Sequence, residues 1–380
     1  MITRPTIKNV SLLQGLLIYV FISNLFCTSN EIICCKEDTQ FREYQNSQKH
    51  LIVNDSISNV QYLADAFKET GMYFNTGFHF YKRGQANYFG YLNASKDSLV
   101  FINLLLNETK KISTAHFIDK NQKYTLRIIN DTLHLVNTKT YTYSQVLIDS
   151  DFTLRSIKTL DLKFAFNSKK YFVNTNVAID KKLIYEHPYL FLTYGNFKTK
   201  NNADSKAIMK INLETKTSKK ILNYPAKYQT CDMFHFYSAI ENISDSTFVL
   251  VFQKMDFLAL VNKRSNNYDK VVDSFFNSQF MCYNSSKEEN LAYTSKFFDN
   301  DESNDNLIYS NNNLYLIKQL RKAKRTDPPK VAILIFDNLL AFKSTIFADR
   351  LLARLSFPYN KGVAILNDSL NKVHYYDLSK

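Results

Sequence analysis

Glycine is scarce in this chain, with seven residues in 380, and tryptophan is absent. Turns therefore cannot depend on glycine. Asparagine can replace it, because its short polar side chain tolerates left-handed backbone angles. The chain has 25 tyrosines and 30 phenylalanines, and aromatic and β-branched residues favour strands. We expect an all-β protein whose turns rest on asparagine and aspartate.

Cysteine is also rare, with five residues. No Cys-x-x-Cys pair and no Cys/His ligand spacing occurs, so the sequence predicts no metal site and no cofactor. Cys231 and Cys282 could form a disulfide in an oxidising compartment or remain buried free thiols. Their spacing leaves both readings open.

Motifs for catalysis are missing as well. The sequence contains no His-Glu-x-x-His, no phosphate-cradling glycine loop and no Gly-x-Ser-x-Gly. The acidic stretch DNDESNDN at 299–306 lacks the glycine and the final glutamate of an EF-hand, so it predicts an exposed acidic loop.

The first 26 residues are typical of an export signal. Arg4 and Lys8 give a basic start, and the apolar run at 12–22 is too short for a membrane-spanning helix of about 20 residues. Cys27 follows where a bacterial lipoprotein carries its lipid, although Phe26 is bulkier than the usual preceding residue. We expect an exported protein, lipid-anchored through Cys27 or simply secreted, with an anchor or linker at 27–49.

The formal net charge is +13, and about +11 once Arg4 and Lys8 leave with the signal. In an exported protein this excess favours an anionic glycan, lipid headgroups or an acidic partner over nucleic acid. The densest basic cluster, KQLRKAKR at 318–325, is expected to be a solvated loop between strands.

A repeat organises the rest of the chain. Two apolar residues precede an Asn or Asp, and in five of six copies an apolar run resumes about nine positions later, which predicts a β-hairpin. The six positions are Asn103, Asp149, Asn212, Asn262, Asp337 and Asp377.

Six copies of a four-stranded unit predict a six-bladed β-propeller over 50–380, with seven blades as the alternative. The sixth copy stops before its last strand. A ring with an unpaired edge invites aggregation, so an N-terminal segment should complete the last blade. The best candidate is the apolar stretch LIV at 51–53.

These features resemble a known family. They are the signal before Cys27, YFGYLN at 88–93, LVFI at 99–102, YPAKY at 224–228 and AILND at 364–368. Together they are similar to the six-bladed β-propeller lipoproteins of unknown function from Bacteroidota-type bacteria, with TolB-like or NHL-like architecture. The resemblance implies a fold over 50–380 and a periplasmic or cell-surface location, and no established reaction.

One tetrapeptide, Phe-His-Phe-Tyr, occurs twice, at 78–81 and 234–237, 25 and 28 residues before Asn103 and Asn262. Because these distances are similar, we interpret the two copies as similarly placed in their blades. Strand alternation could then turn both histidines to the channel or to a shared face. His79, Tyr81, His235 and Tyr237 are the candidate ligand-binding residues. The function expected is non-catalytic binding of a glycan, peptide or envelope protein by a monomer. The alternative is a propeller-fold glycan lyase or hydrolase.

Overall fold

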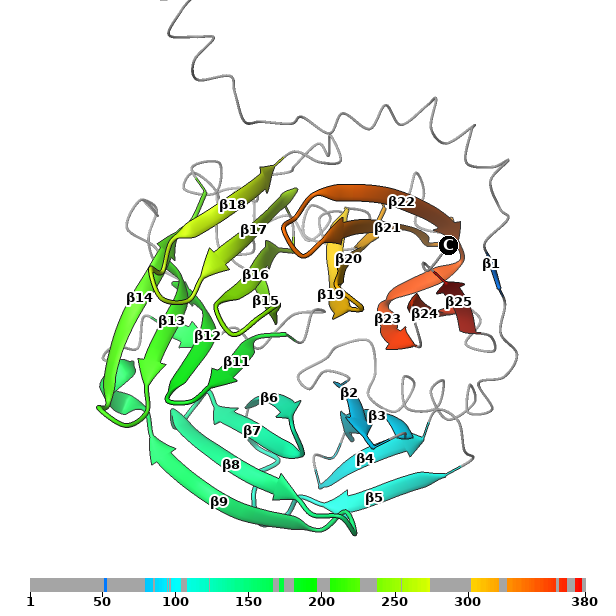
Figure 1. Cartoon of the computed structure of the whole chain (residues 1–380). Coiled ribbons are helices and arrows are strands. Elements are labelled where there is room, and N and C mark those ends of the chain that lie inside the picture. Colours follow the sequence, from blue (N-terminus) through cyan, green and yellow to red (C-terminus); the bar gives the residue numbers. More distant parts are fainter. Residues whose placement is uncertain are drawn as a thin grey trace, which may run out of the picture.

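The computed structural model is a ring of six antiparallel sheets, drawn in Figure 1. The six-bladed β-propeller is therefore confirmed. The described residues are 51–52, 79–166 except 85, 94, 96, 104–107 and 123, 171–173, 181–196, 206–225, 238–273 except 254, 302–320, 327–359, 362–367 and 373–377.

Each blade is a meander of four strands, counted here from the channel outwards. Blade 3 differs because two short inner strands, β10 (Tyr171–Val173) and β11 (Leu183–Glu186), both pair with β12. In order, the other strands are as follows. Blade 1 has β2 (His79–Arg83), β3 (Ala86–Leu92), β4 (Ser98–Asn103) and β5 (Thr109–Ser113); blade 2 has β6 (Tyr124–Ile129), β7 (Thr132–Asn137), β8 (Thr142–Ile148) and β9 (Leu154–Asp161). Blade 3 continues with β12 (Tyr189–Asn196), β13 (Lys206–Asn212) and β14 (Thr217–Asn223); blade 4 has β15 (Ser238–Asn242), β16 (Thr247–Phe252), β17 (Phe257–Asn262) and β18 (Tyr268–Asp273). Blade 5 has β19 (Ser303–Ser310), β20 (Asn313–Gln319), β21 (Lys330–Asp337) and β22 (Phe342–Asp349); blade 6 has β23 (Leu351–Tyr359), β24 (Gly362–Asn367), β25 (Val373–Asp377) and β1 (Leu51–Ile52).

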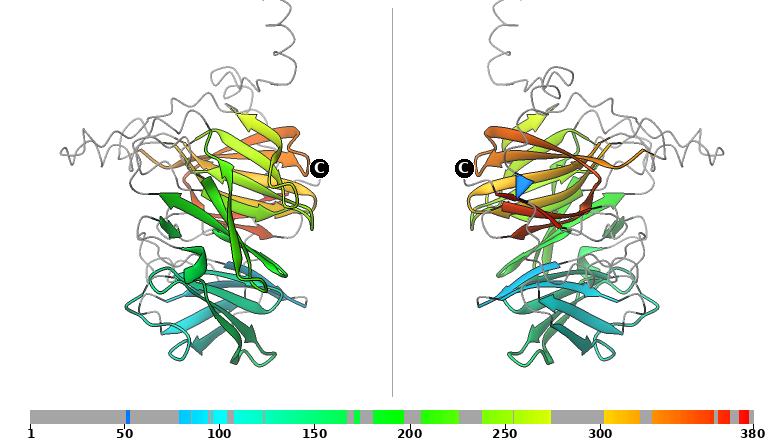
Figure 2. Two further views of the ribbon diagram at one scale, coloured as in Figure 1. Left: turned by 90° about the vertical axis from the view of Figure 1, so that its left-hand side faces the viewer. Right: turned by 90° about the vertical axis from the view of Figure 1, so that its right-hand side faces the viewer.

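The N-terminal strand closes the ring, as the truncated sixth copy predicts. Leu51 pairs with Tyr376 and Ile52 with Tyr375, so β1 is the outer strand of the last blade. Figure 2, right, shows β1 lying against β25. The pairing covers the edge that the chain leaves open at its C-terminus.

The repeated Asn or Asp marks the same place in every blade, the end of the third strand or the residue after it. At Asn212, Asn262 and Asp337 its side chain caps the turn to the outer strand. Asn262 Oδ1, for example, accepts from the N–H groups of Arg264 at 2.9 Å and Ser265 at 3.0 Å. Asn and Asp also occupy left-handed turn positions, as at Asn130 and Asp131. The expected replacement of glycine by these residues is confirmed at such turns. The six repeat positions are Asn103, Asp149, Asn212, Asn262, Asp337 and Asp377.

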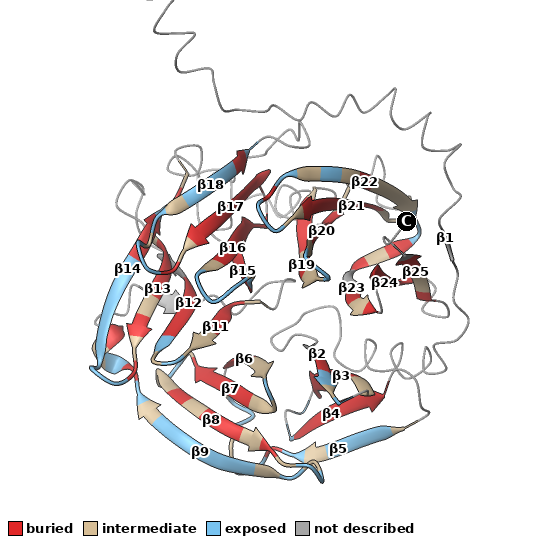
Figure 3. Cartoon of the chain, viewed as in Figure 1, coloured by how far each residue is buried: buried red, intermediate tan, exposed pale blue. Residues whose placement is uncertain are grey.

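Apolar packing holds the blades side by side. Six buried clusters lie one at each interface between neighbours, including the interface of blade 6 with blade 1. The middle strands are buried on both faces and read as continuous apolar runs, such as FLALVN in β17. The outer strands β5, β9, β14 and β18 are largely exposed, and β22 is partly exposed (Figure 3). All five carry lysine, which discourages edge-to-edge pairing.

The two ends of the ring differ in their connections. Turns between the first and second strands, and between the third and fourth, lie at one end, which we call the hairpin end. Connections between the second and third strands, and from each blade to the next, lie at the other, the crossover end. The longest stretches between strands, such as 274–302, begin and end at the crossover end.

Two expectations about charged segments are wrong. Ser303–Ser310 form β19, with Asn304 and Asp305 buried, so the acidic stretch does not end in an exposed loop. Lys318 lies on β20 and is buried, so the basic cluster begins inside a strand. In each segment a polar side chain finds its partner in blade 4: Lys318 pairs with Asp256, and Asn304 donates to the carbonyls of Phe252 and Met255. None of the described segments forms a helix with the length and apolar content of a membrane span.

Candidate functional site

A polar cluster joins the inner edges of blades 2, 3 and 4. Arg127 is on β6, Glu241 is on β15, and Lys181 precedes β11 by two residues. Arg127 Nη2 lies 2.7 Å from Glu241 Oε1, and the Lys181 ammonium pairs with Glu241 Oε2. The side chains are 16%, 26% and 9% exposed for Arg127, Lys181 and Glu241. This group is the channel cluster.

Backbone groups complete the cluster. Inner strands have one edge without a neighbouring strand, so their buried carbonyls need other partners. Arg127 Nη1 donates to the carbonyls of Leu183 at 2.8 Å and Ile240 at 3.4 Å. Lys182, 3% exposed, donates from Nζ to the carbonyl of Ser238 at 2.6 Å. The charged side chains thus connect three inner strands.

The cluster carries excess positive charge. Burial raises the pKa of Glu241, but the charges of Arg127 and Lys181 and their hydrogen bonds outweigh it, so its pKa falls below the ordinary value. The carboxylate therefore stays ionised at neutral pH. Two cations, Arg127 and Lys181, thus face one carboxylate. Such a site attracts anions and is poorly suited to general acid catalysis by Glu241.

His134 lies beside Arg127, its cross-strand partner on β7. Burial, and then the charge of Arg127, lower the pKa of His134 to about 4, so its ring is neutral at pH 7. Its Nδ1 is 2.8 Å from the hydroxyl of Tyr143, which also accepts from Gln145 Nε2 at 2.8 Å. His134 is 2% exposed and packs against the Tyr185 ring of blade 3, with centroids 4.6 Å apart.

A second charged group lies at the crossover end, between blades 4 and 5. Lys318 Nζ is 3.2 Å from Glu302 Oε2 and also pairs with Asp256. Asn304 donates from Nδ2 to the carbonyls of Phe252 at 2.7 Å and Met255 at 2.8 Å. These contacts anchor the turn after β16 to the start of β19. Lys318 and Asp256 are both buried, so we assign them a structural role.

Two of the four ligand-binding residues predicted from sequence lie in the described part of the chain. His79 begins β2. Tyr81 is 4% exposed, packs between blades 1 and 2, and donates its hydroxyl to Asp131. His235 and Tyr237 lie outside the described residues, as do Cys27, Cys231 and Cys282. Ligand binding by His79, Tyr81, His235 and Tyr237 stays a prediction.

The two Phe-His-Phe-Tyr copies are not equivalent by register. Tyr81 aligns with Asn103 across β3, whereas in blade 4 the row of Asn262 passes through Thr247 and extends to Ile243. The second copy ends at Tyr237, six residues before that position. The residue that corresponds to His79 is Glu241, because both lie two positions before this row. Counting from the Asn alone misses that the first hairpin is shorter in blade 4 than in blade 1.

Arg127, Lys181 and Glu241 are missing from the sequence-based prediction. A signal for two of them exists: each is a lone charge in a strand of otherwise small or apolar residues, YTLRII and SAIEN. Arg127 and Glu241 are 114 residues apart in the sequence, so the spacing of residues does not indicate that they meet. Within the part of the chain that the structure describes, no group of three His, Cys, Asp or Glu residues could hold a metal ion.

The fold and the channel cluster define the class of protein, a six-bladed β-propeller with a charged channel. Comparison with known families finds no match to the sequence, and comparison with curated proteins finds none either. A member of the DUF4221 family from Bacteroides vulgatus is similar in structure, with a TM-score of 0.60 and 11% identity over 80% of this chain and 92% of that one.

Another similar structure is a putative 6-phosphogluconolactonase from Bacteroides uniformis, with a TM-score of 0.42 and 10% identity over 79% of this chain and 80% of that one. At 11% identity, the likeness to the DUF4221 structure shows the fold alone.

Proposed function

We propose that this chain is a non-catalytic cell-envelope protein that binds an acidic glycan, peptide or protein segment in its channel, entering from the crossover end. The observation that carries the proposal is the excess of cations in the channel cluster. Lys181 is the most exposed of its three charged side chains, so it is the group that a ligand anion would reach. The net charge of about +11 that remains after Arg4 and Lys8 leave acts in the same direction over longer distances.

Each residue of the proposed site would have a different role. Arg127 is held by one carboxylate and two carbonyls, so it would orient Glu241 and maintain the field. Lys181 would share its ammonium between Glu241 and the ligand. His79 occupies the register position in β2 that Glu241 occupies in β15, which supports keeping it in the site. Tyr81 would position neighbouring groups, because its hydroxyl is engaged by Asp131.

The same proposal includes export and attachment. The signal at 1–26 would be removed, and Cys27 would carry the lipid of an outer-membrane or cell-surface anchor. Mass spectrometry of the native membrane fraction tests this. A lipid mass on Cys27 supports anchoring; an unmodified Cys27 or a mature terminus beyond 27 leaves secretion and removes the anchor.

Binding is tested by titrating the full mature chain with oligomers of a uronic acid and with neutral oligosaccharides of equal length. Lys181→Gln should weaken uronate binding about tenfold, the equivalent of one charge-assisted contact. His79→Ala should weaken it as well. Lys158→Gln removes an exposed lysine from outer strand β9 and should leave binding unchanged.

Two results would contradict the proposal. Equal losses for Lys181→Gln and Lys158→Gln would mean that only the overall charge attracts the oligomer. Chain shortening or unsaturated products during the titration would support the lyase or hydrolase alternative instead.

A further inference from the structure

A cavity of about 280 Å³ lies on the outer wall of the ring, between blades 3 and 4. Strands β13 and β14 form one wall, and the hairpin between β17 and β18 forms the other. Lys206, Lys219 and Lys220 line it together with Asn223, Asn266 and Asn267. Among the residues that the structure describes, none that lines it carries a carboxylate. We call this cavity the rim pocket; it is separate from the channel cluster.

The strand register gathers lysines on the wall that faces blade 4. Lys210 pairs directly with Lys219, and Lys206 pairs with Asn223. The pair between them, Ile208 and Ile221, packs in the apolar cluster shared with blade 4. Since side chains alternate along a strand, Lys206, Lys210 and Lys219 share this face.

Stability alone does not account for this arrangement. Like charges directly opposite each other on neighbouring strands are destabilising, and burial followed by the charge of Lys219 lowers the pKa of Lys210. Edge protection explains lysines on outer strands such as β14. It does not explain Lys206 and Lys210 on β13, a third strand that is paired on both sides. Among the other third strands, only β21 has a lysine, at its first residue, Lys330.

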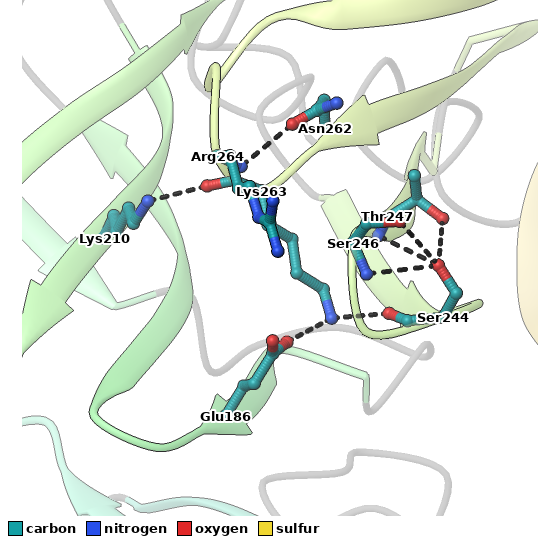
Figure 4. Close-up of polar contacts among 8 residues, drawn as sticks. All are labelled: Glu186, Lys210, Ser244, Ser246, Thr247, Asn262, Lys263 and Arg264. Carbon is teal, nitrogen blue, oxygen red and sulfur yellow. Dashed lines mark hydrogen bonds and ion pairs between the residues drawn. The ribbon is translucent and has the colours of Figure 1, made fainter.

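The local acceptors are already occupied. Lys210 Nζ donates to the carbonyl of Lys263 at 2.6 Å and to Asn266 Oδ1 at 3.1 Å. Figure 4 shows Lys210 directed at this carbonyl, while the Lys263 ammonium turns to Glu186 and to the Ser244 carbonyl.

Lys206 donates to Asn223 Oδ1. The Lys219 ammonium makes no ion pair or hydrogen bond with any residue that the structure describes. The lining residues that the structure describes therefore supply three ammonium groups and no carboxylate, and Glu186, the carboxylate whose charge acts on Lys210, is paired with Lys263.

We propose that the rim pocket binds a tetrahedral oxyanion, the phosphate or sulfate group of a small ester such as a substituted sugar. Lysines act as point charges suited to phosphate, whereas carboxylates are matched best by the planar fork of arginine. Asparagine amides add neutral donors. The volume is at the small end of ligand sites, enough for the anion and part of the group that carries it.

The test titrates the full mature chain with inorganic phosphate, inorganic sulfate, glucose 6-phosphate and glucose 6-sulfate at constant ionic strength. Lys219→Gln should weaken binding about tenfold, as expected for one charge-assisted contact. The control Lys158→Gln makes the same charge change on the outer strand of blade 2 and should alter binding less than twofold. Phosphate and sulfate arms show which ester the pocket prefers.

A second measurement uses the unaltered chain. Amine labelling followed by mass spectrometry should show Lys206 and Lys219 protected by the better ester, with Lys158 labelled at the same rate throughout. Equal effects of the two substitutions, or protection that is equal at all three lysines, would overturn the proposal. Neither outcome depends on whether uronates bind in the channel.

Discussion

Replacing Arg127 with methionine should destabilise the ring more than any loss of a surface charge. The change keeps much of the side-chain length and removes three contacts at once: the ion pair with Glu241 and the hydrogen bonds to the carbonyls of Leu183 and Ile240. Glu241 would stay buried with Lys181 as its remaining cation.

The magnitude follows from burial. Removing one member of a buried ion pair costs about 3–5 kcal/mol, because the other charge is left uncompensated. Lys181 compensates part of this, so we expect a loss of about 3 kcal/mol in the free energy of unfolding. Arg127→Met combined with Glu241→Met should cost less than the sum of the single changes, since the double variant leaves no orphaned carboxylate.

Urea unfolding of the mature chain measures the effect. The matched control is Arg155→Met, which removes a pair with Asp149 at 3.5 Å from a side chain that is 68% exposed and should cost less than about 1 kcal/mol. A cost below about 1 kcal/mol for Arg127→Met, or strict additivity in the double variant, would refute the reasoning.

Three further predictions concern pH, the turn caps and ring closure. Burial, and then the charge of Arg127, lower the pKa of His134 from 6.5 to about 4. As pH falls, the unfolded chain binds this proton before the folded chain does, so stability should fall between about pH 6.5 and 4. His134→Gln should flatten the profile of urea midpoint against pH in this range. Asn262→Ala removes the two hydrogen bonds by which this side chain caps its turn. It should lower the free energy of unfolding in urea by about 1–2 kcal/mol, whereas Asn267→Ala should lower it little. Deleting 50–56 removes β1 from β25 and should lower stability and promote association through the open edge, seen by light scattering; a monomer of unchanged stability would contradict the closure.

The fold could be predicted from sequence because its signal is local and repeated. An Asn or Asp marks the end of the third strand six times, and at Asn212, Asn262 and Asp337 its side chain also caps the next turn. Closure by β1 followed from the missing strand and the cost of an open edge. Lys318 was misjudged because a lysine next to a basic run looks solvated, and its buried partner Asp256 is 62 residues away.

The site was much less predictable. Arg127, Lys181 and Glu241 meet because three inner strands converge on one axis, and nothing in their spacing indicates that. The match between the two Phe-His-Phe-Tyr copies misled in the opposite way. The identical tetrapeptides suggested equal positions, but the first hairpins of blades 1 and 4 differ in length. Register depends on every turn between two strands, which the repeated tetrapeptide does not record.

Hydrogen exchange of the mature chain, with and without a saturating uronate oligomer, tests the binding claim most directly. A ligand at the channel cluster should slow exchange in the segments around Lys181 and Glu241, while β9 on the outer wall stays unchanged. Slowed exchange in the outer strands alone, or no change around Lys181 and Glu241 at a saturating concentration, would contradict binding in the channel.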